Sequence, residues 1–369
     1  MTKGQILIID DSALVRSYLA KMLLNVPDME LCDVASNGKI GFQKILARKP
    51  DVVILDLEMD HGDGLYVLQN IQDQLQPQDR PFVLIYSARA KHDDPLFRKA
   101  IEFGFSDFII KVQGNPEDIL SELRKAFFDK LRAAIQAKKN RTMRSPINSI
   151  LKDEYDITVP HGLNALPLIL ERKKINPKIL IIGASTGGPL SVSKIMQEIT
   201  SIKVPVVVIQ HMPEGFTKSF AEELGRISGL PAHELAHNMS LEKGHIYVFP
   251  GGMHGRLTAF GNLFVFYADR QDYIAHPFKP SVNLAIENLV KSINGHAIFA
   301  VLSGMGKDGG LAAKFLHDKG SLVIAQDKES SVVWGMPGAV VKENAADILL
   351  PQDELGRGIQ MILKTYNIA

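Results

Sequence analysis

The chain has 369 residues, of which 46% are hydrophobic and 22% charged, a composition typical of globular proteins and a length that favours two domains. The formal net charge of +1 gives no overall basic field, so the sequence predicts no nucleic-acid partner. The single cysteine, Cys32, excludes an intrachain disulfide and a metal centre built from several cysteines.

The N-terminal sequence, MTKGQILIIDDS, reaches two aspartates after too short an apolar run for a signal peptide. No apolar run elsewhere in the sequence approaches the ~20 residues that span a bilayer. We therefore expect a cytoplasmic protein without membrane insertion.

The first part of the chain alternates short apolar runs with segments of helical periodicity. Strands are expected at Gln5–Ile9, Glu30–Ala35, Val52–Leu55, Phe82–Tyr86 and Phe108–Ile110. Helices are expected between them, for example at Ala13–Leu24 and Gly38–Arg48, with a last one through Ile119, Leu120, Leu123, Phe127 and Leu131. Short apolar runs of this kind are typical of parallel strands buried on both faces. The pattern predicts a doubly wound, flavodoxin-like α/β domain over residues 1–128.

A linker is expected over residues 129–177, where periodicity is weak. Its first turns should extend the preceding helix. The run KLRAAIQAKKNRTMR at 130–144 carries six basic residues and no acidic one. This run is either a docking patch for an acidic partner or a solvated helix face.

A second alternating pattern begins at Lys178. Strands are expected at Ile179–Ile182, Val204–Gln210, His245–Phe249, Phe264–Tyr267, His296–Leu302 and Leu322–Ala325. Helices are expected at Pro189–Ile199, Thr217–Ser228, Val282–Ser292 and Gly309–Lys319. The pattern predicts a second α/β domain with a doubly wound parallel sheet, Rossmann-like, over residues 178–369.

Polar side chains close the strands of the first domain: Asp10 and Asp11, Asp56, Ser87 and Lys111. Ligands bind outside the carboxyl ends of the strands in an open parallel sheet, so we expect these groups to converge. Three carboxylates suit Mg²⁺, and a hydroxyl and a lysine beside them suit a phosphoryl group. Capping of the first helix could explain Asp11 or Ser12, but it does not explain Asp56, Ser87 and Lys111 together.

This set resembles the receiver domain of two-component response regulators, over the whole of the first predicted domain. The resemblance implies that Asp56 accepts phosphate from a histidine kinase. It also implies that Asp10, Asp11 and Asp56 hold Mg²⁺, and that Ser87 and Lys111 sense the phosphate.

Three further positions bear on that resemblance. Phe108 falls where the receiver family has its switch aromatic residue. Asp60 replaces a usual proline and adds a negative charge near the phosphorylation site. Val112 replaces the proline that usually follows the lysine, where a cis peptide is common. We expect phosphorylation to survive both departures, with changed kinetics.

The turn Gly183-Ala-Ser185-Thr-Gly187 in the second domain fits G-x-S-x-G, a strand-to-helix turn that exposes a nucleophilic serine. The N-terminus of the following helix can stabilise an oxyanion. It can bind a phosphate equally well. The turn alone therefore leaves both functions open.

A nucleophilic serine needs a base and a group that orients the base. His211 closes the next expected strand, and Asp308 follows another strand at the start of a helix. With Ser185 they form a set that fits nucleophilic acyl transfer, although a lone histidine or a helix N-terminal carboxylate is often structural. Their order along the chain differs from the Ser–Asp–His order of α/β-hydrolases, which argues against that fold.

The segment GMGKDG at 304–309 offers an alternative, because it matches the G-x-G-x-x-G of dinucleotide sites, with Asp327 about 20 residues later. Against this interpretation, Asp308 would place a like charge against the pyrophosphate. The interpretation also leaves Ser185 and His211 unexplained.

The segments IGASTGGP, QHMP, LSGMGKDGG and AQDKESSVVWGMPGAV, with HPFKPSVN and YVFPGGMHGRL, resemble the catalytic domain of chemotaxis protein-glutamate methylesterases. With the receiver in front, the resemblance covers the whole chain except the linker. It implies Ser185 as nucleophile, His211 as general base and Asp308 as the residue that orients the base. Thr186 lies beside the histidine, and the backbone N–H of Met305 is a candidate oxyanion donor.

The resemblance implies a phosphorylation-activated esterase with no cofactor in its catalytic domain. It would hydrolyse glutamyl methyl esters on the cytoplasmic helices of methylated chemoreceptors, release methanol, and could also deamidate receptor glutamines. Its other partner would be the histidine kinase of a chemosensory pathway. In the family, the unphosphorylated receiver covers the catalytic face. The alternative is a non-enzymatic response regulator whose phosphorylated form acts by partner binding.

Overall fold

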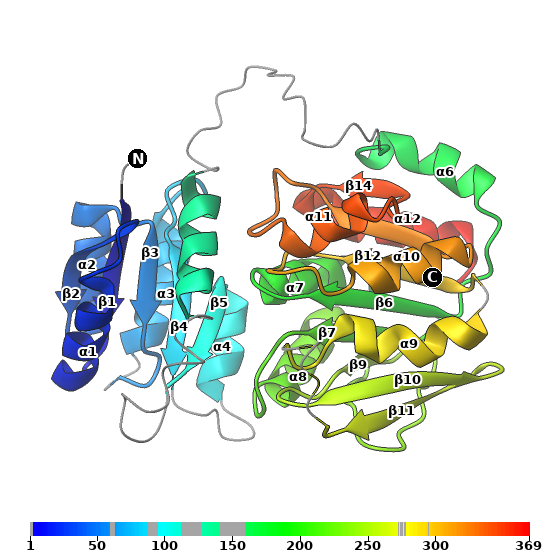
Figure 1. Cartoon of the computed structure of the whole chain (residues 1–369), viewed down its shortest axis with the longest axis horizontal. Helices are drawn as coiled ribbons and strands as arrows, with labels where there is room; N and C mark the ends of the chain where they lie inside the picture. The colour runs from blue at the N-terminus through cyan, green and yellow to red at the C-terminus, as the bar shows by residue number, and fades with distance from the viewer. Residues whose placement is uncertain are drawn as a thin grey trace. The chain divides into compact units, whose positions relative to one another are not determined.

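The structure is a computed structural model, and it describes residues 3–59, 63–87, 95–111, 127–139 and 159–369, apart from 272, 274–275, 277 and 294. The chain divides into two compact units, residues 1–147 and 148–369, and each is an α/β unit (Figure 1). Asp60 and Val112, singled out above, lie outside the described residues. Among the described helices, none is long and apolar enough to cross a membrane.

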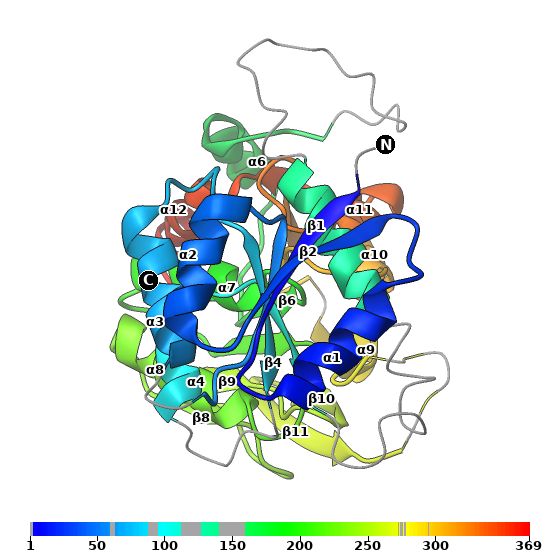
Figure 2. The ribbon, with the colours of Figure 1, turned by 90° about the vertical axis from the view of Figure 1, so that its left-hand side faces the viewer.

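The first unit is built on a parallel sheet of order β2-β1-β3-β4-β5. Its strands are β1 (Gly4–Ile9), β2 (Met29–Ala35), β3 (Val52–Leu55), β4 (Phe82–Ser87) and β5 (Asp107–Ile110). Its labelled helices are α1 (Ala13–Leu23), α2 (Gly38–Arg48), α3 (Asp63–Gln74) and α4 (Pro95–Phe103). Figure 2 shows α2, α3 and α4 on one face of the sheet and α1 with residues 127–139 on the other. This strand order confirms the predicted flavodoxin-like fold.

Residues 127–139 are helical and belong to the first unit. Lys130 Nζ lies 2.7 Å from Asp107 Oδ1, and Arg132 Nε lies 2.9 Å from Asp28 Oδ2. These two members of the basic run therefore pair within their own unit. Neither alternative considered for the run, a docking patch or a solvated face, anticipated this pairing.

The second unit is built on a seven-stranded parallel sheet of order β14-β13-β12-β6-β7-β9-β8. Its strands are β6 (Ile179–Ala184), β7 (Val206–Gln210), β8 (Ala232–Glu234), β9 (Ile246–Val248), β12 (Ala297–Val301), β13 (Leu322–Gln326) and β14 (Ile348–Leu350). Every residue of the central strand β6 is buried. The chain leaves β6 toward β7 and later returns on its other side at β12. The predicted doubly wound fold is thus confirmed, and ligands are expected at this reversal of strand order.

Six helices accompany this sheet: α7 (Gly188–Glu198), α8 (Thr217–Ser228), α9 (Val282–Ile293), α10 (Gly310–Asp318), α11 (Gly335–Lys342) and α12 (Gln352–Thr365). Helix α7 contacts both α8 and α12, and α10 contacts both α9 and α11. The helices thus form two groups of neighbours, as a doubly wound sheet requires.

A β-hairpin in the second unit was not expected. The predicted strand Phe264–Tyr267 lies in β11 (Leu263–Asp269), which pairs antiparallel with β10 (His254–Phe260) instead of joining the main sheet. The two-residue turn between them contains Gly261 at φ +65°, a conformation that glycine adopts without strain. The hairpin packs on α9.

The described end of the predicted linker belongs to the second unit. It forms the short helix η2 (Leu163–Ala165) and helix α6 (Leu166–Arg172), and Leu166 and Leu170 are buried. The Gly162 N–H donates to the Leu349 carbonyl at 2.9 Å. The region predicted as linker thus contributes ordered residues to both units, and the boundaries at 128 and 178 remain predictions.

Candidate active site and phosphoacceptor site

Three carboxylates gather where β1 and β3 of the first unit end. Oxygens of Asp10, Asp11 and Asp56 lie within 4.8 Å of one another, and Asp10 and Asp56 are buried. The Ser12 N–H donates to Asp10 Oδ1 at 2.9 Å, and the Glu58 N–H donates to Asp56 Oδ1 at 3.0 Å. The backbone therefore orients each buried carboxylate through one oxygen, and the other oxygen of each contacts Lys111. This all-oxygen set fits Mg²⁺.

Lys111 supplies the positive charge of this site. Its Nζ lies 2.9 Å from Asp10 Oδ2 and also contacts Asp56 Oδ2. Burial lowers the pKa of Lys111, but hydrogen bonds to Asp56 and Asp10 outweigh burial, so the pKa lies above its ordinary value. Burial raises the pKa of Asp10, and the lysine only partly offsets this. Lys111 is therefore a firmly protonated cation beside the phosphoacceptor candidate.

The two remaining predicted residues of this unit are both buried. Ser87 ends β4, and its hydroxyl donates to Glu58 Oε1 at 3.4 Å. Phe108 on β5 packs edge-on against Phe97, with ring centroids 6.0 Å apart. Glu58 was not predicted from the sequence, although its place two residues after Asp56 could have suggested it.

In the second unit, Ser185 and His211 follow neighbouring parallel strands. Ala184 at the end of β6 pairs with Gln210 at the end of β7, and the His211 N–H donates to the Ala184 carbonyl at 3.0 Å. Gln210 Nε2 donates to the Ser185 carbonyl at 2.9 Å and so holds the turn after β6 in place. The Ser185 side chain is therefore held at the carboxyl edge of the sheet, next to His211.

Glycine is required in this turn for steric reasons. Gly187 has φ +81°, and a Cβ there would lie 2.7 Å from Val332. A Cβ on Gly188 would lie 2.1 Å from Gln210 Oε1. The glycines therefore let α7 start directly under the turn, with its N-terminus beside Ser185.

Asp308 joins His211 from a third strand end. Its Oδ2 lies 2.8 Å from His211 Nε2. The carboxylate also accepts hydrogen bonds from the Val282 and Asn283 N–H groups at the N-terminus of α9, and from Ser281 Oγ. Burial by itself raises the pKa of Asp308, but His211 and these amides outweigh burial, so the pKa lies below its ordinary value. Asp308 is therefore an ionised partner for the imidazole.

The remaining contacts of His211 are a ring stack and an unbonded ring nitrogen. Its ring stacks on Phe278 with centroids 4.8 Å apart and planes 7° apart. His211 Nδ1 is buried and has no hydrogen-bond partner among the described residues. Among the residues that the structure describes, the Ser185 hydroxyl forms no hydrogen bond with His211. The structure thus brings the two residues to adjacent positions without joining them, a common state in enzymes without substrate.

The turn after β12 lies against the nucleophile candidate. A Cβ on Gly304 would come within 2.8 Å of Ser185 Cβ, so Met305 follows a residue in close contact with the serine. Thr186 is buried, and its carbonyl accepts from Ser303 Oγ at 2.7 Å. Because Asp308 is engaged with His211 within this same turn, a dinucleotide would meet a fixed negative charge there. This arrangement disfavours the dinucleotide alternative.

A cavity of about 850 Å³ opens beside Asp308 and is lined in part by Phe278, Lys307 and Trp334. No role was predicted from the sequence for Phe278, Ser281 or Gln210. The first two lie in the motif HPFKPSVN, quoted above only for its resemblance. Ser281 stands directly before a predicted helix, and this position could have suggested that its hydroxyl forms hydrogen bonds at the helix N-terminus.

Comparison with known proteins assigns both halves of the chain. Residues 180–359 match the CheB methylesterase family and residues 6–124 match the response regulator receiver domain. The chain is 34% identical, over 97% of its length and 99% of the relative's, to the protein-glutamate methylesterase/protein-glutamine glutaminase of Lawsonia intracellularis. The chain belongs to the CheB methylesterase family. It is therefore an ester hydrolase fused to a receiver, and both predicted resemblances are confirmed.

A second relative matches most of the chain, and two solved structures match parts of it. The Thermotoga maritima relative of the same description is 31% identical over 94% of this chain and 95% of its own. The crystal structure of the T. maritima CheB methylesterase catalytic domain is 36% identical, with a TM-score of 0.47, and covers 51% of this chain and 100% of that one. The T. maritima CheB response regulator domain is 26% identical, with a TM-score of 0.32, and covers 37% of this chain and 98% of that one.

Proposed function

We propose that this member of the CheB methylesterase family hydrolyses glutamyl methyl esters on chemoreceptor helices, and that phosphorylation of its receiver activates it. The observation that carries the proposal is the ionised Asp308 held 2.8 Å from His211, next to the turn that holds Ser185. The names of its relatives, protein-glutamate methylesterase/protein-glutamine glutaminase, supply the substrate class. The same triad would serve for deamidation of receptor glutamines.

Acylation would begin with attack of Ser185 Oγ on the ester carbonyl carbon. His211 takes the serine proton, and its Nδ1 is the free ring nitrogen, because Nε2 is engaged by Asp308. The negative charge of Asp308 stabilises the imidazolium. The tetrahedral intermediate collapses when His211 returns the proton to the departing methoxide, which leaves as methanol.

Deacylation would use the same groups in reverse. His211 removes a proton from water, the water oxygen attacks the acyl carbon, and Ser185 Oγ leaves with the proton. The product is glutamate. Charge on the carbonyl oxygen would be stabilised by the N-terminus of α7 and by the Met305 N–H, the donor candidate in the adjacent turn.

Control by the receiver would act through Asp56. Asp10, Asp11 and Asp56 would hold Mg²⁺, which when bound neutralises the phosphoryl group during its transfer. Lys111 now contacts Asp10 and Asp56, and a phosphoryl group on Asp56 would compete for that cation. Ser87 and Phe108 would sense the change. The phosphoryl donor would be the histidine kinase of a chemosensory pathway, and the protein would act in the cytoplasm.

Methanol release from methylated receptor membranes tests this function. Wild type should release methanol faster with a small-molecule phosphodonor than without one. Ser185→Ala should release essentially none in either condition, whereas Ser201→Ala, which removes an exposed hydroxyl in the same unit, should behave as wild type. Equal release by Ser185→Ala and wild type would favour the alternative, a regulator that acts by partner binding alone.

A further inference from the structure

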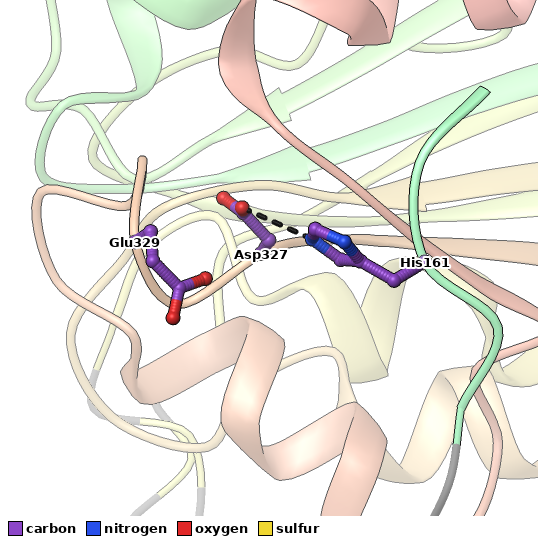
Figure 3. A group of neighbouring side chains, drawn as sticks. All are labelled: His161, Asp327 and Glu329. Carbon is purple, nitrogen blue, oxygen red and sulfur yellow. Dashed lines mark hydrogen bonds and ion pairs between the residues drawn. The ribbon is translucent and has the colours of Figure 1, made fainter. Parts of the chain in front are cut away.

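A second group of potential metal ligands lies in the catalytic unit, separate from the triad. It comprises His161, Asp327 and Glu329, whose side chains each offer one ligand atom within 4.8 Å of the others (Figure 3). His161 precedes η2 and forms a β-bridge with Leu349, whereas Asp327 and Glu329 lie in the loop that follows β13. Residues far apart in the sequence are therefore held at one point.

Asp327 is a buried carboxylate without a lysine or arginine partner among the residues that the structure describes; it is 3% exposed. Its Oδ1 accepts from the Ser330 N–H at 2.9 Å and from the Ser330 hydroxyl. Its Oδ2 faces only His161 Nε2, at 3.2 Å. Buried carboxylates are usually paired with a cation or bound to a metal ion. Asp327 has neither a lysine nor an arginine beside it among the described residues, which leaves a place for a metal ion.

Glu329 adds a second negative charge to the group. Its side chain is exposed and has no ion-pair partner in the described part of the chain. Two carboxylates that share a small space repel each other, and a divalent cation between them would remove that repulsion. The two carboxylates therefore give this point a net negative charge, which favours the binding of a cation.

We propose that His161, Asp327 and Glu329 bind a divalent transition-metal ion of the zinc type. One imidazole nitrogen with two carboxylate oxygens suits Zn²⁺ better than Mg²⁺ or Ca²⁺, which prefer oxygen alone. Bonds of about 2.0–2.1 Å in a tetrahedral site put ligand atoms roughly 3.3 Å apart. The 3.2 Å between His161 Nε2 and Asp327 Oδ2 matches that spacing. Ion binding at Nε2 needs only the neutral tautomer with its proton on Nδ1.

The proposed ion would brace the catalytic unit. The loop after Asp327 continues to Val332, against which Gly187 packs, and to Val333, whose N–H donates to Ser303 Oγ at 2.9 Å. Both contacts involve the turn that carries Ser185, since Gly187 belongs to it and Ser303 Oγ donates to its Thr186 carbonyl at 2.7 Å. The ion would therefore tie His161 to the loop that supports this turn, without touching the triad.

Zinc titration of the full chain tests the site independently of esterase activity. Excess Mg²⁺ is present to occupy the receiver carboxylates. Isothermal titration with ZnCl₂ should show one tight equivalent in wild type. His161→Asn and Glu329→Gln alter exposed side chains, so the fold is not at risk, and each should weaken that equivalent at least tenfold.

His233→Asn is the matched control, because it removes an exposed imidazole that stacks on His245 elsewhere in the unit. It should leave the tight equivalent unchanged. Zinc should also raise the melting temperature of wild type and His233→Asn, and raise it less in the other two variants. Unchanged zinc affinity in both His161→Asn and Glu329→Gln, or no binding by wild type at micromolar zinc, would overturn the proposal.

Discussion

His211 Nε2 lies 2.8 Å from Asp308 Oδ2, while the opposite ring nitrogen has no partner among the described residues. One nitrogen is thus committed to a carboxylate and the other is left for a proton transfer. The backbone N–H groups at the N-terminus of α9 hold the Asp308 carboxylate in place. The carboxylate in turn fixes the orientation of the imidazole.

Replacing Asp308 with asparagine should remove the charge with little change of shape. We expect kcat on methylated receptors to fall roughly 10³–10⁴-fold, because the amide favours the wrong imidazole tautomer and cannot stabilise the imidazolium. KM should change little, since Asp308 acts on the base His211 and not on the bound substrate. A loss of less than tenfold in kcat would show that Asp308 is not the partner of the base.

Asp308 should also make the stability of the catalytic unit depend on pH. Its pKa in the folded chain lies below the ordinary value of 3.8, so the folded state holds its proton less tightly than the unfolded state. Its contribution to the free energy of unfolding is complete above about pH 4 and is lost as pH falls through the folded pKa.

Denaturant unfolding of wild type and Asp308→Asn, followed by the fluorescence of the single tryptophan, Trp334, measures this effect. The two proteins should differ at pH 7, and the difference should begin to shrink near pH 4 and disappear as pH falls through the lowered pKa of Asp308. Glu214→Gln, at an exposed carboxylate outside the helices and strands, is the control and should track wild type throughout. A difference that stays constant with pH would contradict the assigned ionisation.

Phe278 should position the base through ring stacking. Phe278→Ala should lower kcat by up to about tenfold, because aromatic pairs contribute about 0.5–1.5 kcal/mol. Phe278→Tyr keeps the stack and should restore most of the rate. If tyrosine were no better than alanine, the ring would matter for a reason other than stacking on His211.

Lys111→Met should uncouple the receiver from the esterase. The phosphodonor should no longer raise methanol release, while basal release stays unchanged. Mg²⁺ should bind several-fold more tightly in a calorimetric titration, because the cation that now contacts Asp10 and Asp56 is absent. Lys44→Met removes a lysine paired with Asp33 in the same unit and should change neither property. Normal activation of Lys111→Met would contradict its proposed role.

Periodicity and apolar runs predicted the parallel strands of both units except β8 and β14. Val52–Leu55 was expected as found, and most other strands differ by one or two residues at their ends. Such strands are buried on both faces, so their sequences are continuous apolar runs with polar residues at each end. The strand predicted at Phe264–Tyr267 is present within β11, but its partner β10 was not predicted, because a partly exposed strand has no equally distinct pattern.

The sequence predicted those residues of the candidate site that follow the carboxyl ends of strands. Ser185, His211 and Asp308 each follow an apolar run, and parallel strands bring such ends together. Phe278 and Ser281 could not be found this way, because they reach His211 and Asp308 from a segment between elements. The convergence of Lys111 with Asp10 was expected from the strand ends, but their direct ion pair was not, since it depends on side-chain reach across the sheet edge.

The measurement that bears most directly on the proposed function is covalent labelling of the nucleophile. The full chain is treated with a serine-directed phosphonofluoridate, and the label is located by peptide mass mapping while methanol release is followed in parallel. The proposed mechanism predicts one adduct, at Ser185, whose appearance matches the loss of activity, and little labelling in His211→Ala. Complete loss of activity with the label at another residue, or full activity with Ser185 labelled, would contradict it.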